Sequence, residues 1–440
     1  MLFSSCRRGR SLPVLLVATL LLAAGPARAG NWPGWRGPTG DSVSRETRLP
    51  VTWSEQENLA WKAPLPEWGN STPAIWDDAV FLTAEHDNRL LLLRIDKATG
   101  ARIWTRQVGT GTAYRKGRPG TRKAQFHQLH NLASPSPATD GEHVVVHFGN
   151  GDFACYDVDG NRIWKRNLAD DYGRYTIWWG YGSSPVLYGD WVITVCMQDS
   201  LADLDLEPAT SYVVAHEVRT GREAWKTLRM TGAQAESCDS YTTPVLHQRG
   251  SQDELIVMGG NQLDAYDPAT GKPLWWLPGL EGGRTITGPT LAGGMVFTTV
   301  GMRGPLHAVE LGGTGRLSDQ DAIRWRASQS TPDTCCPVVW NDLLLTVSDN
   351  GIAVCRDAGT GELYWQERLA GGDYKSSPLA AEGRFYCVDR SGVTTVLAAS
   401  KKFQKLAENR LDDEFIASPA VSEGRLYLRG RKSLYAIGRE

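Results

Sequence analysis

Residues 243–275 read TPVLHQRGSQDELIVMGGNQLDAYDPATGKPLW, and this stretch decides the fold. It opens on a small residue followed by proline and closes on a tryptophan. Between these ends, four short segments of alternating apolar and polar residues are separated by turn residues. That pattern is typical of a four-stranded antiparallel sheet.

The opening small-Pro or Gly-Pro step recurs eight times along the chain. The steps are Thr72-Pro73, Ser136-Pro137, Ser184-Pro185, Thr243-Pro244, Gly288-Pro289, Cys336-Pro337, Ser377-Pro378 and Ser418-Pro419. Successive steps lie between 41 and 64 residues apart, so the base repeat is about 40 residues with insertions early in the chain. Four-stranded repeats of this length predict an all-β, eight-bladed β-propeller. An open sandwich or a two-domain arrangement is the alternative.

The strongest part of the repeat is Asp-x-x-Thr-Gly-x-x-x-Trp, at residues 96–104, 267–275 and 357–365. Glycine supplies the positive φ of a tight turn, and the Asp and Thr side chains satisfy backbone groups in it. The tryptophan then brings a large apolar surface into the outermost strand. These residues are therefore assigned to architecture.

The two ends of the repeat region complement each other. The last repeat, from Ser418 onward, has three predicted strands, and the segment around Trp61 reads as a fourth strand without a blade. We expect the Trp61 segment to complete the last blade and close the ring, which removes the open sheet edges.

With its turn motifs and small-Pro steps, the chain resembles the pyrroloquinoline quinone (PQQ) repeat, or quinoprotein-like, propellers over nearly all of residues 61–438. That superfamily includes the quinoprotein alcohol dehydrogenases and the non-catalytic outer-membrane assembly propellers of the BamB type, which are closest in size. The resemblance implies the fold, and because the motif is structural in both branches it does not imply PQQ binding.

The N-terminus reads as an export signal over residues 1–29, with a basic start, a short apolar stretch and a small-x-small end. We expect a strap over residues 30–58 and the propeller over residues 59–440. Removal of the signal takes four positive charges from the formal net charge of −2 and leaves −6, which argues against nucleic acid as a partner. No cysteine stands at the end of the apolar stretch for lipoprotein acylation, and no other segment could span a bilayer, so we expect a soluble, monomeric protein of the periplasm or cell envelope.

The longest insertions fall at residues 108–132, 169–182, 198–212 and 230–241, and the propeller topology predicts all of them on the face around the central mouth. Loops gathered on one face usually mark a binding face. The first insertion is cationic, with Arg115, Lys116, Arg118, Arg122 and Lys123, followed by His127 and His130. An anionic ligand or acidic partner is one interpretation, and a solvated loop that pairs with an acidic neighbour is the other.

Metal-binding interpretations have weaker support. His127-x-x-His130 has no third ligand that the sequence identifies. Asp203, Asp205 and Glu207 offer hard oxygen ligands for calcium, but they lack the spacing of a known calcium loop. We therefore expect no metal, and an ordinary acidic loop is the simpler interpretation.

Aromatic residues and a cysteine pair complete the set of mouth candidates. Trp178, Trp179, Tyr181 and Tyr241 precede small-Pro steps, so they are expected to line the mouth, where they could stack on a planar ligand or plug the channel. Cys335 and Cys336 stand where the repeat otherwise has Ser-Ser. A vicinal disulfide against PQQ is a feature of many quinoprotein alcohol dehydrogenases, but there it lies on an early blade, and here the pair begins the sixth.

Three functions remain open. The first is an exported, non-catalytic scaffold that presents its loop-rich face to a protein or ligand in the cell envelope, with no cofactor. It is favoured because no acid–base pair or nucleophile constellation emerges from the sequence. The second is a PQQ- and calcium-dependent alcohol or sugar dehydrogenase. The third is a binding module for a small ligand or glycan.

Overall fold

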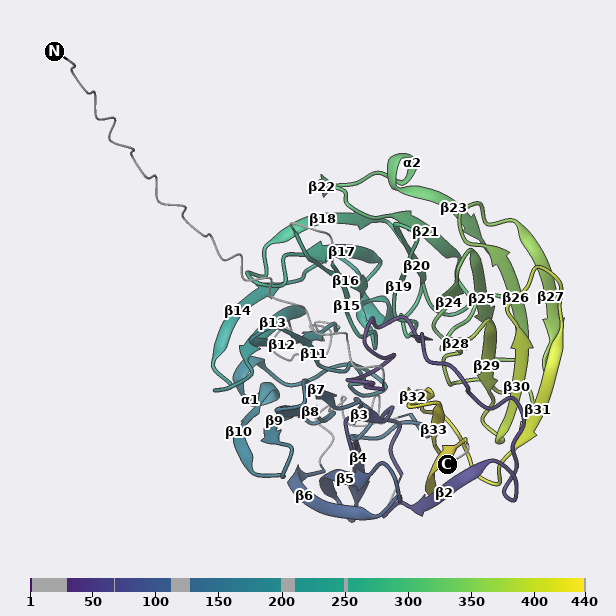
Figure 1. The fold of residues 1–440 in the computed structure, drawn as a ribbon. Helices are drawn as coiled ribbons and strands as arrows, with labels where there is room; N and C mark the ends of the chain where they lie inside the picture. Colours follow the sequence, from purple (N-terminus) through teal and green to yellow (C-terminus); the bar gives the residue numbers. More distant parts are fainter. Residues whose placement is uncertain (2–29, 67, 112–126, 199–209, 249–251, 439–440) are drawn as a thin grey trace, which may run out of the picture.

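The computed structural model describes residue 1 and residues 30–66, 68–111, 127–198, 210–248 and 252–438. These residues form eight sheets arranged in a ring (Figure 1). The all-β, eight-bladed propeller predicted from the repeat is confirmed. The predicted signal lies outside the described residues except for Met1. In the part of the chain that is described, no helix is long and apolar enough to span a bilayer.

In every blade the innermost strand begins directly after the proline of a small-Pro step. Blades 1 to 4 consist of β3 (Ala74–Trp76), β4 (Ala79–His86), β5 (Arg89–Asp96) and β6 (Arg102–Thr110); β7 (Ala138–Thr139), β8 (His143–His147), β9 (Asp152–Asp157) and β10 (Arg162–Asn167); β11 (Val186–Tyr188), β12 (Trp191–Cys196), β13 (Tyr212–Glu217) and β14 (Glu223–Leu228); and β15 (Val245–His247), β16 (Glu254–Gly259), β17 (Gln262–Tyr266) and β18 (Pro273–Pro278).

Blades 5 to 8 follow the same order from the inside to the outside. They consist of β19 (Thr290–Ala292), β20 (Met295–Thr299), β21 (Leu306–Glu310) and β23 (Ile323–Ala327); β24 (Val338–Trp340), β25 (Leu343–Val347), β26 (Ile352–Asp357) and β27 (Leu363–Arg368); β28 (Leu379–Ala381), β29 (Arg384–Val388), β30 (Val393–Ala398) and β31 (Lys405–Arg410); and β32 (Ala420–Ser422), β33 (Arg425–Arg429), β34 (Ser433–Ile437) and β2 (Leu59–Pro64). Short helical turns lie in the connections: α1 (Leu168–Tyr172), η2 (Ala235–Cys238) and α2 (Asp319–Ala322).

The N-terminal strand closes the ring as expected. β2 pairs antiparallel with β34, and Trp61 lies opposite Ala436. Two sheets also carry a fifth strand that the repeat does not predict. β1 (Val43–Ser44) pairs parallel with β28, and β22 (Gly315–Arg316) pairs parallel with β18. Both are two-residue segments outside the repeat motif, so the periodic pattern contains no signal for them.

The turn motif joins each blade to its neighbour. The Oδ1 of Asp96 accepts hydrogen bonds from the backbone N and the hydroxyl of Thr99, at 2.8 and 2.7 Å. Gly100 follows at φ +74°, and a Cβ there would lie 2.6 Å from the indole of Trp61, which comes from the preceding blade. The indole Nε1 of Trp61 donates to the carbonyl of Lys97 at 3.0 Å. Glycine is therefore required both by the turn and by the tryptophan that packs on it.

The same indole-to-turn bond recurs around the ring. The pairs are Trp104 with Val158, Trp164 with Val218, Trp225 with Pro268, Trp325 with Ala358 and Trp365 with Ser400. Blade 4 differs, since the Nε1 of Trp275 donates to the carboxylate of Glu254 within its own blade.

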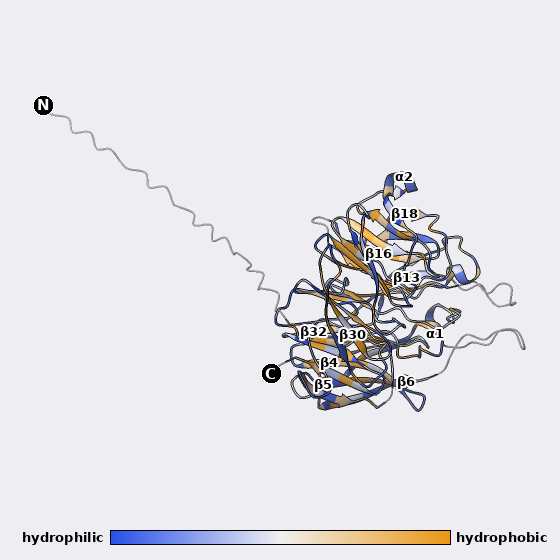
Figure 2. Cartoon of the chain, turned by 90° about the vertical axis from the view of Figure 1, so that its right-hand side faces the viewer, coloured by the Kyte–Doolittle hydropathy of each residue, from blue (hydrophilic) through white to orange (hydrophobic). Residues whose placement is uncertain are grey.

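The apolar core lies between neighbouring blades, since each sheet buries both faces. Between blades 1 and 2, Phe81, Val144 and Tyr156 are buried together. The cluster that closes the ring combines residues of blades 7, 8 and 1 with Trp32 and Trp53 of the strap. Edge-on, the hydrophobic colour follows the strands of the blades, and α2 at the rim is hydrophilic (Figure 2).

The small-Pro residues form a ladder of hydrogen bonds around the central mouth. In six of the eight blades, the backbone N–H of the residue before the proline donates to the side chain at the equivalent position of the next blade. The distances are 2.9 Å from Thr72 to Ser136, from Ser136 to Ser184 and from Ser184 to Thr243, 3.1 Å from Gly288 to the Sγ of Cys336, 3.0 Å from Cys336 to Ser377 and 3.1 Å from Ser377 to Ser418. A short side chain with an acceptor atom is therefore what the repeat selects at this position.

Gly288 interrupts the ladder because the strap occupies its space. A Cβ on Gly288 would lie 2.8 Å from the indole Cη2 of Trp35, closer than non-bonded carbon atoms approach. Gly288 has no positive φ, so the backbone does not require glycine there. Blade 4 thus finds no side-chain acceptor on blade 5, and the strap tryptophan takes that place.

The strap is anchored to inner strands around the ring. Trp32 exchanges two backbone hydrogen bonds with Ile75 of blade 1, at 2.8 and 2.7 Å. Arg36 is fully buried and donates to the carbonyls of Pro289 at 3.0 Å and Pro337 at 2.8 Å, in blades 5 and 6. Figure 1 shows the strap, in purple, crossing the centre of the ring before it reaches β2.

The ladder predicts that the chemistry of the Cys336 acceptor matters more than the sulfur itself. Cys336→Ala leaves the buried N–H of Gly288 without a partner and is expected to lower the free energy of unfolding by about 1–3 kcal/mol. Cys336→Ser restores the acceptor found at the equivalent position of blades 2, 3, 7 and 8 and is expected to cost less than about 1 kcal/mol. Denaturant unfolding of the three proteins checks this, and equal losses for both variants would contradict the ladder.

A double-mutant cycle tests the contact between strap and ladder. Gly288→Ser forces its Cβ into the indole of Trp35 and is expected to destabilise the protein by about 1–3 kcal/mol. In a Trp35→Ala background the same change is expected to be nearly neutral, because the space is then open. A cost for Gly288→Ser that is independent of Trp35 would show that another contact requires the glycine.

Candidate functional site

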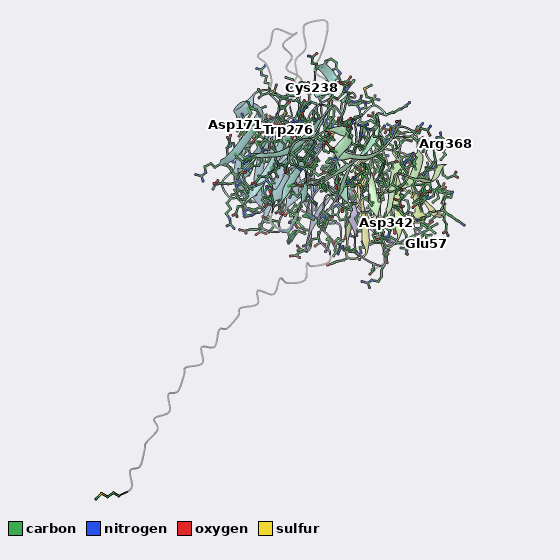
Figure 3. All side chains as sticks on the ribbon, turned by 90° about the horizontal axis from the view of Figure 1, so that it is seen from above. Glu57, Asp171, Cys238, Trp276, Asp342 and Arg368 are labelled. Carbon is green, nitrogen blue, oxygen red and sulfur yellow. The ribbon has the colours of Figure 1, made fainter. Side chains whose placement is uncertain are left out.

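The ladder and the insertions surround one cavity of about 540 Å³ at the mouth of the ring. Cys238, in the connection between blades 3 and 4, lies toward one face of the disc, and Asp342 and Glu57 lie toward the opposite face (Figure 3). The cavity opens on the face of that connection, since Glu236 and Tyr241 line it. The face predicted from the insertions therefore carries the cavity.

The floor is formed by the strap and the ladder. Trp35 lies at the bottom with ladder residues whose side chains are too small to fill the channel; these are Ser136, Ser184, Thr243, Ser377 and Ser418. The guanidinium of Arg36 lies 5.4 Å from the centre of the Trp35 ring. Since Arg36 is itself held by blades 5 and 6, the floor is a fixed part of the fold.

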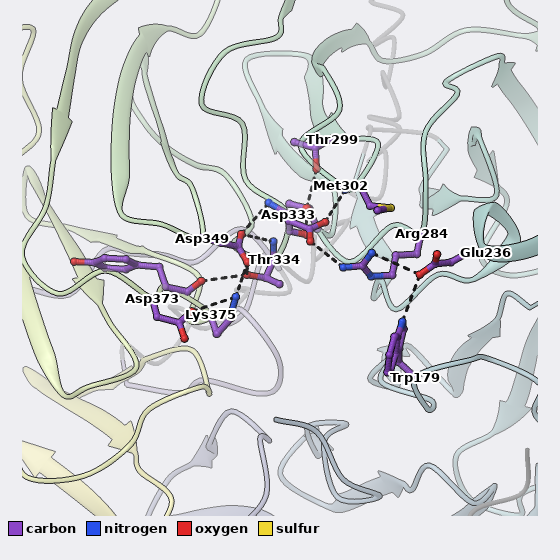
Figure 4. A network of polar contacts seen from close by, with 12 residues as sticks. Trp179, Glu236, Arg284, Thr299, Met302, Asp333, Thr334, Asp349, Asp373 and Lys375 are labelled. Carbon is purple, nitrogen blue, oxygen red and sulfur yellow. Dashed lines mark hydrogen bonds and ion pairs between the residues drawn. The ribbon is translucent and has the colours of Figure 1, made fainter. Parts of the chain in front are cut away.

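One side of the cavity carries a guanidinium held between two carboxylates (Figure 4). Arg284 lies 3.0 Å from the Oδ2 of Asp333 and 3.6 Å from the Oε1 of Glu236. The other oxygen of Asp333 accepts from the backbone N of Met302 at 2.6 Å. Met302 has a φ of +45°, a conformation that is strained for a side chain of this size, and its position fixes Asp333 from the far side.

The adjoining side repeats this arrangement with an ammonium group. Lys375 lies 2.7 Å from Asp349 and 3.2 Å from Asp373. Burial lowers the pKa of Lys375, but the hydrogen bond to Asp349 and the charges of Asp349 and Asp373 outweigh it and raise the pKa overall. Lys375 is therefore a cation at neutral pH. The two arrangements are joined, because the backbone N of Asp333 donates to the Oδ1 of Asp349 at 3.0 Å.

The opposite side is aromatic. The backbone N of Trp179 donates to the hydroxyl of Tyr241 at 3.3 Å, and its Nε1 lies 3.4 Å from Glu236. The ring of His127 meets Trp179 edge-on at 5.4 Å. Burial lowers the pKa of His127, and the charges of Lys375 and Arg284 lower it further, so His127 is neutral at pH 7.

The ion pairs continue outward over blades 7 and 8. Arg390 contacts Asp373 at 2.7 Å and Glu414 at 3.6 Å, and Arg431 contacts Glu414 at 3.1 Å. The guanidinium of Arg431 lies over the ring of Trp68 at 4.6 Å. Charges of alternating sign thus form an arc from the cavity to the rim.

The structure separates the candidates named from the sequence. His127, His130, Trp179 and Tyr241 line the cavity. Trp178 does not; its backbone N donates to Asp239 at 2.9 Å and its ring meets Trp179 edge-on. Tyr181 lies between blades 2 and 3, below the mouth, fully buried and bonded to the carbonyl of Val195 at 2.8 Å. Its own hydroxyl reaches a strand carbonyl, which draws the ring into the core.

Cys335 and Cys336 are free and buried. The Sγ of Cys335 lies 3.3 Å from the carbonyl of Ser376, and that of Cys336 accepts from Gly288. The remaining candidates lie outside the described residues: Arg115, Lys116, Arg118, Arg122 and Lys123 of the cationic insertion, and Asp203, Asp205 and Glu207 of the acidic one. Among the described residues, no three His, Cys, Asp or Glu side chains gather to hold a metal.

Sequence reasoning missed the charged side of the cavity. Arg284, Asp333 and Lys375 each stand two to four residues before a small-Pro step, in connections too short to count as insertions. Asp349 lies in the turn between β25 and β26, which reaches the same face. The missed signal is position: a charged side chain just before a small-Pro step points toward the mouth whatever the length of its loop.

Comparison with known proteins gives one family and a set of similar structures. The family described as outer membrane protein assembly factor BamB matches residues 37–207, 209–304 and 312–405. BamB from Moraxella catarrhalis is 14% identical with a TM-score of 0.58, over 86% of this chain and 99% of that chain. No curated protein sequence matches this chain.

Enzymes are also among the similar structures. A quinohemoprotein alcohol dehydrogenase from Comamonas testosteroni is 13% identical with a TM-score of 0.67, over 95% of this chain and 82% of that chain. A europium-containing methanol dehydrogenase is 11% identical with a TM-score of 0.63, over 92% of this chain and 90% of that chain. At these identities the likeness shows the propeller fold.

The buried histidine beside Tyr181 predicts a pH dependence of stability. Burial, with a smaller effect from His216, lowers the pKa of His147 to about 3, whereas an unfolded histidine titrates near about 6.5. Between these values the unfolded chain binds the extra proton, so this histidine makes stability fall as the pH drops below about 6.5, by at most about 1.4 kcal/mol per pH unit.

Unfolding of His147→Gln between pH 7 and pH 4 is expected to show a shallower loss than the parent protein. Tyr175→Phe is the control, because it removes the 2.9 Å hydrogen bond to the Nε2 of His147 and keeps the imidazole. An unchanged slope in His147→Gln would assign the pH dependence to other groups.

Proposed function

This chain belongs to the family of outer membrane protein assembly factor BamB, and from that premise we propose that it is a non-catalytic binding propeller whose mouth face receives a protein or ligand partner. The observation that carries the proposal is the state of the charged side chains at the mouth. Arg284 is held between Glu236 and Asp333, and Lys375 between Asp349 and Asp373. Groups fixed in this way present a preorganised binding surface.

Asp349 illustrates why these groups suit binding better than proton transfer. Its two oxygens accept from the backbone N of Asp333, the backbone N and hydroxyl of Thr334, and the ammonium of Lys375, at 2.7 to 3.1 Å. A carboxylate that already accepts four hydrogen bonds has no lone pair left for a substrate proton. Asp349 therefore holds the cavity wall together.

The alternative is a PQQ- and calcium-dependent dehydrogenase, since the similar structures include a quinohemoprotein alcohol dehydrogenase and a methanol dehydrogenase. The described lining fits this cofactor poorly. PQQ carries three carboxyl groups, and the cavity presents the carboxylates of Glu236, Asp333 and Asp349 against only two cations. A polyanion would meet like charge there and would have to break existing ion pairs.

The place of action belongs to the same proposal. The export signal read from residues 1–29 and membership in an outer-membrane assembly family support a protein of the cell envelope. The positive charge of the insertion at residues 115–123 would suit an acidic partner surface.

Site-specific photo-crosslinking in the native cell envelope tests which face binds. A photoreactive amino acid at Gln234, exposed beside η2 on the mouth face, is expected to capture a partner. The same amino acid at Asp342, exposed on the opposite face, is the matched control and is expected to capture none. Adducts from Asp342 alone would refute the mouth as the binding face.

The enzyme alternative is tested on the purified protein without its signal. Titration with PQQ and calcium, followed by dye-linked oxidation of ethanol and glucose, is expected to show no turnover. Turnover that requires PQQ would replace the scaffold with a dehydrogenase.

A further inference from the structure

We propose that the mouth cavity binds a neutral saccharide unit. The proposal rests on the binding role proposed above for the mouth face and names the chemistry that the cavity would recognise. The cavity volume of about 540 Å³ lies within the range of about 300–1,000 Å³ that is typical of small-molecule pockets and is large enough for one or two sugar rings.

The cavity is closed at its bottom. Trp35 ends the channel below the cavity, and the contact with Gly288 and the anchored Arg36 keep it there. A ligand thus enters from the mouth face and stops against an indole and a set of hydroxyl-bearing ladder residues. A floor of this kind suits a compact ligand better than an extended chain threading the ring.

The cavity has an aromatic side and a charged side. One side presents the indole of Trp179, the phenol of Tyr241 and the neutral imidazole of His127. The other side presents the ion pairs of Arg284 with Asp333 and of Lys375 with Asp349 (Figure 4). A sugar ring has the matching division, since its C–H face packs on aromatic rings and its hydroxyl groups lie around its edge.

The charged groups on the second side are already joined in ion pairs. A hydroxyl group donates one hydrogen bond and accepts others, so it can contact the carboxylate and the cation of one ion pair at once. Asp333 and Asp349, linked at 3.0 Å through a backbone N–H, place two such pairs side by side. One ring hydroxyl could contact both Arg284 and Asp333, and an adjacent hydroxyl could accept from the ammonium of Lys375, since Asp349 itself already accepts four hydrogen bonds.

The same pairing disfavours charged ligands. An anion would compete with Asp333 or Asp349 for the side chains of Arg284 and Lys375. A cation would compete with Arg284 and Lys375 for the carboxylates of Asp333 and Asp349. In either case one member of a partly buried pair would lose its partner, which is costly. A neutral ligand with many hydroxyl groups avoids that cost.

The test is a titration of the purified mature protein with three uncharged disaccharides: cellobiose, maltose and N,N′-diacetylchitobiose. Isothermal calorimetry gives the dissociation constants. At least one disaccharide is expected to bind with a Kd below about 10 mM. Glucuronate and PQQ are the anionic probes and are expected to bind at least about tenfold more weakly.

Two variants locate the site. Trp179→Ala is expected to raise the Kd about tenfold by removing the stacking surface. Asp333→Asn frees Arg284 from one carboxylate while keeping the side-chain volume, and is expected to raise the Kd for the disaccharide by a similar factor. Trp276→Ala, a half-buried tryptophan on the outer strand β18, is the matched control and is expected to leave the Kd unchanged. Thermal unfolding of each variant verifies folding.

The outcomes separate the two proposals. Failure of all three disaccharides to bind, or tighter binding of an anionic probe, overturns the saccharide site, and crosslinks from Gln234 would then still support the mouth as a binding face. Saccharide binding that Trp179→Ala leaves unchanged and Trp276→Ala weakens would place the ligand outside the cavity and also overturn the proposal. PQQ-dependent turnover would overturn the non-catalytic function itself.

Discussion

In six of the eight blades, the residue before the inner-strand proline donates its backbone N–H to the short side chain at the same position of the next blade, and the geometry of the mouth depends on this contact. Ser136, Ser184 and Ser377 serve both as acceptors and as the small residues that leave the channel open. Each hydrogen bond of the ladder joins two blades. The residue type at a small-Pro step therefore depends on the neighbouring blade as well as on its own strand. The ladder therefore couples the repeat to the cavity.

The interruption of the ladder gives the cavity its floor. At Gly288 the acceptor side chain is absent, and Trp35 of the strap fills the space. The walls above carry charges already neutralised in pairs, with Arg284 and Lys375 each held between two carboxylates. An aromatic floor, an aromatic side and a side of paired charges together form a surface suited to recognition. The proposed binding function follows from that combination.

The sequence predicts the blades, their number and the closing strand, because hydrophobic alternation and turn residues determine the local backbone conformation within a few residues. It also identified His127, Trp179 and Tyr241 as mouth residues. It could not place Tyr181, whose ring is drawn into the core by a hydrogen bond to Val195, nor Asp349, which lies in a turn within blade 6. The positions of Tyr181 and Asp349 depend on contacts that differ from blade to blade, and the repeat pattern does not distinguish the blades.

The eight-bladed ring follows from the amino-acid sequence alone, since each Asp-x-x-Thr-Gly-x-x-x-Trp turn and each small-Pro step encodes a local conformation that repeats. The hydrogen bond that Cys336 accepts in the ladder and the space that Gly288 leaves for Trp35 exist only in the folded ring. The same is true of the cavity in which Arg284, Asp333, Asp349 and Lys375 meet. The physical reason is distance along the chain: side chains tens to hundreds of residues apart become neighbours only when the ring closes.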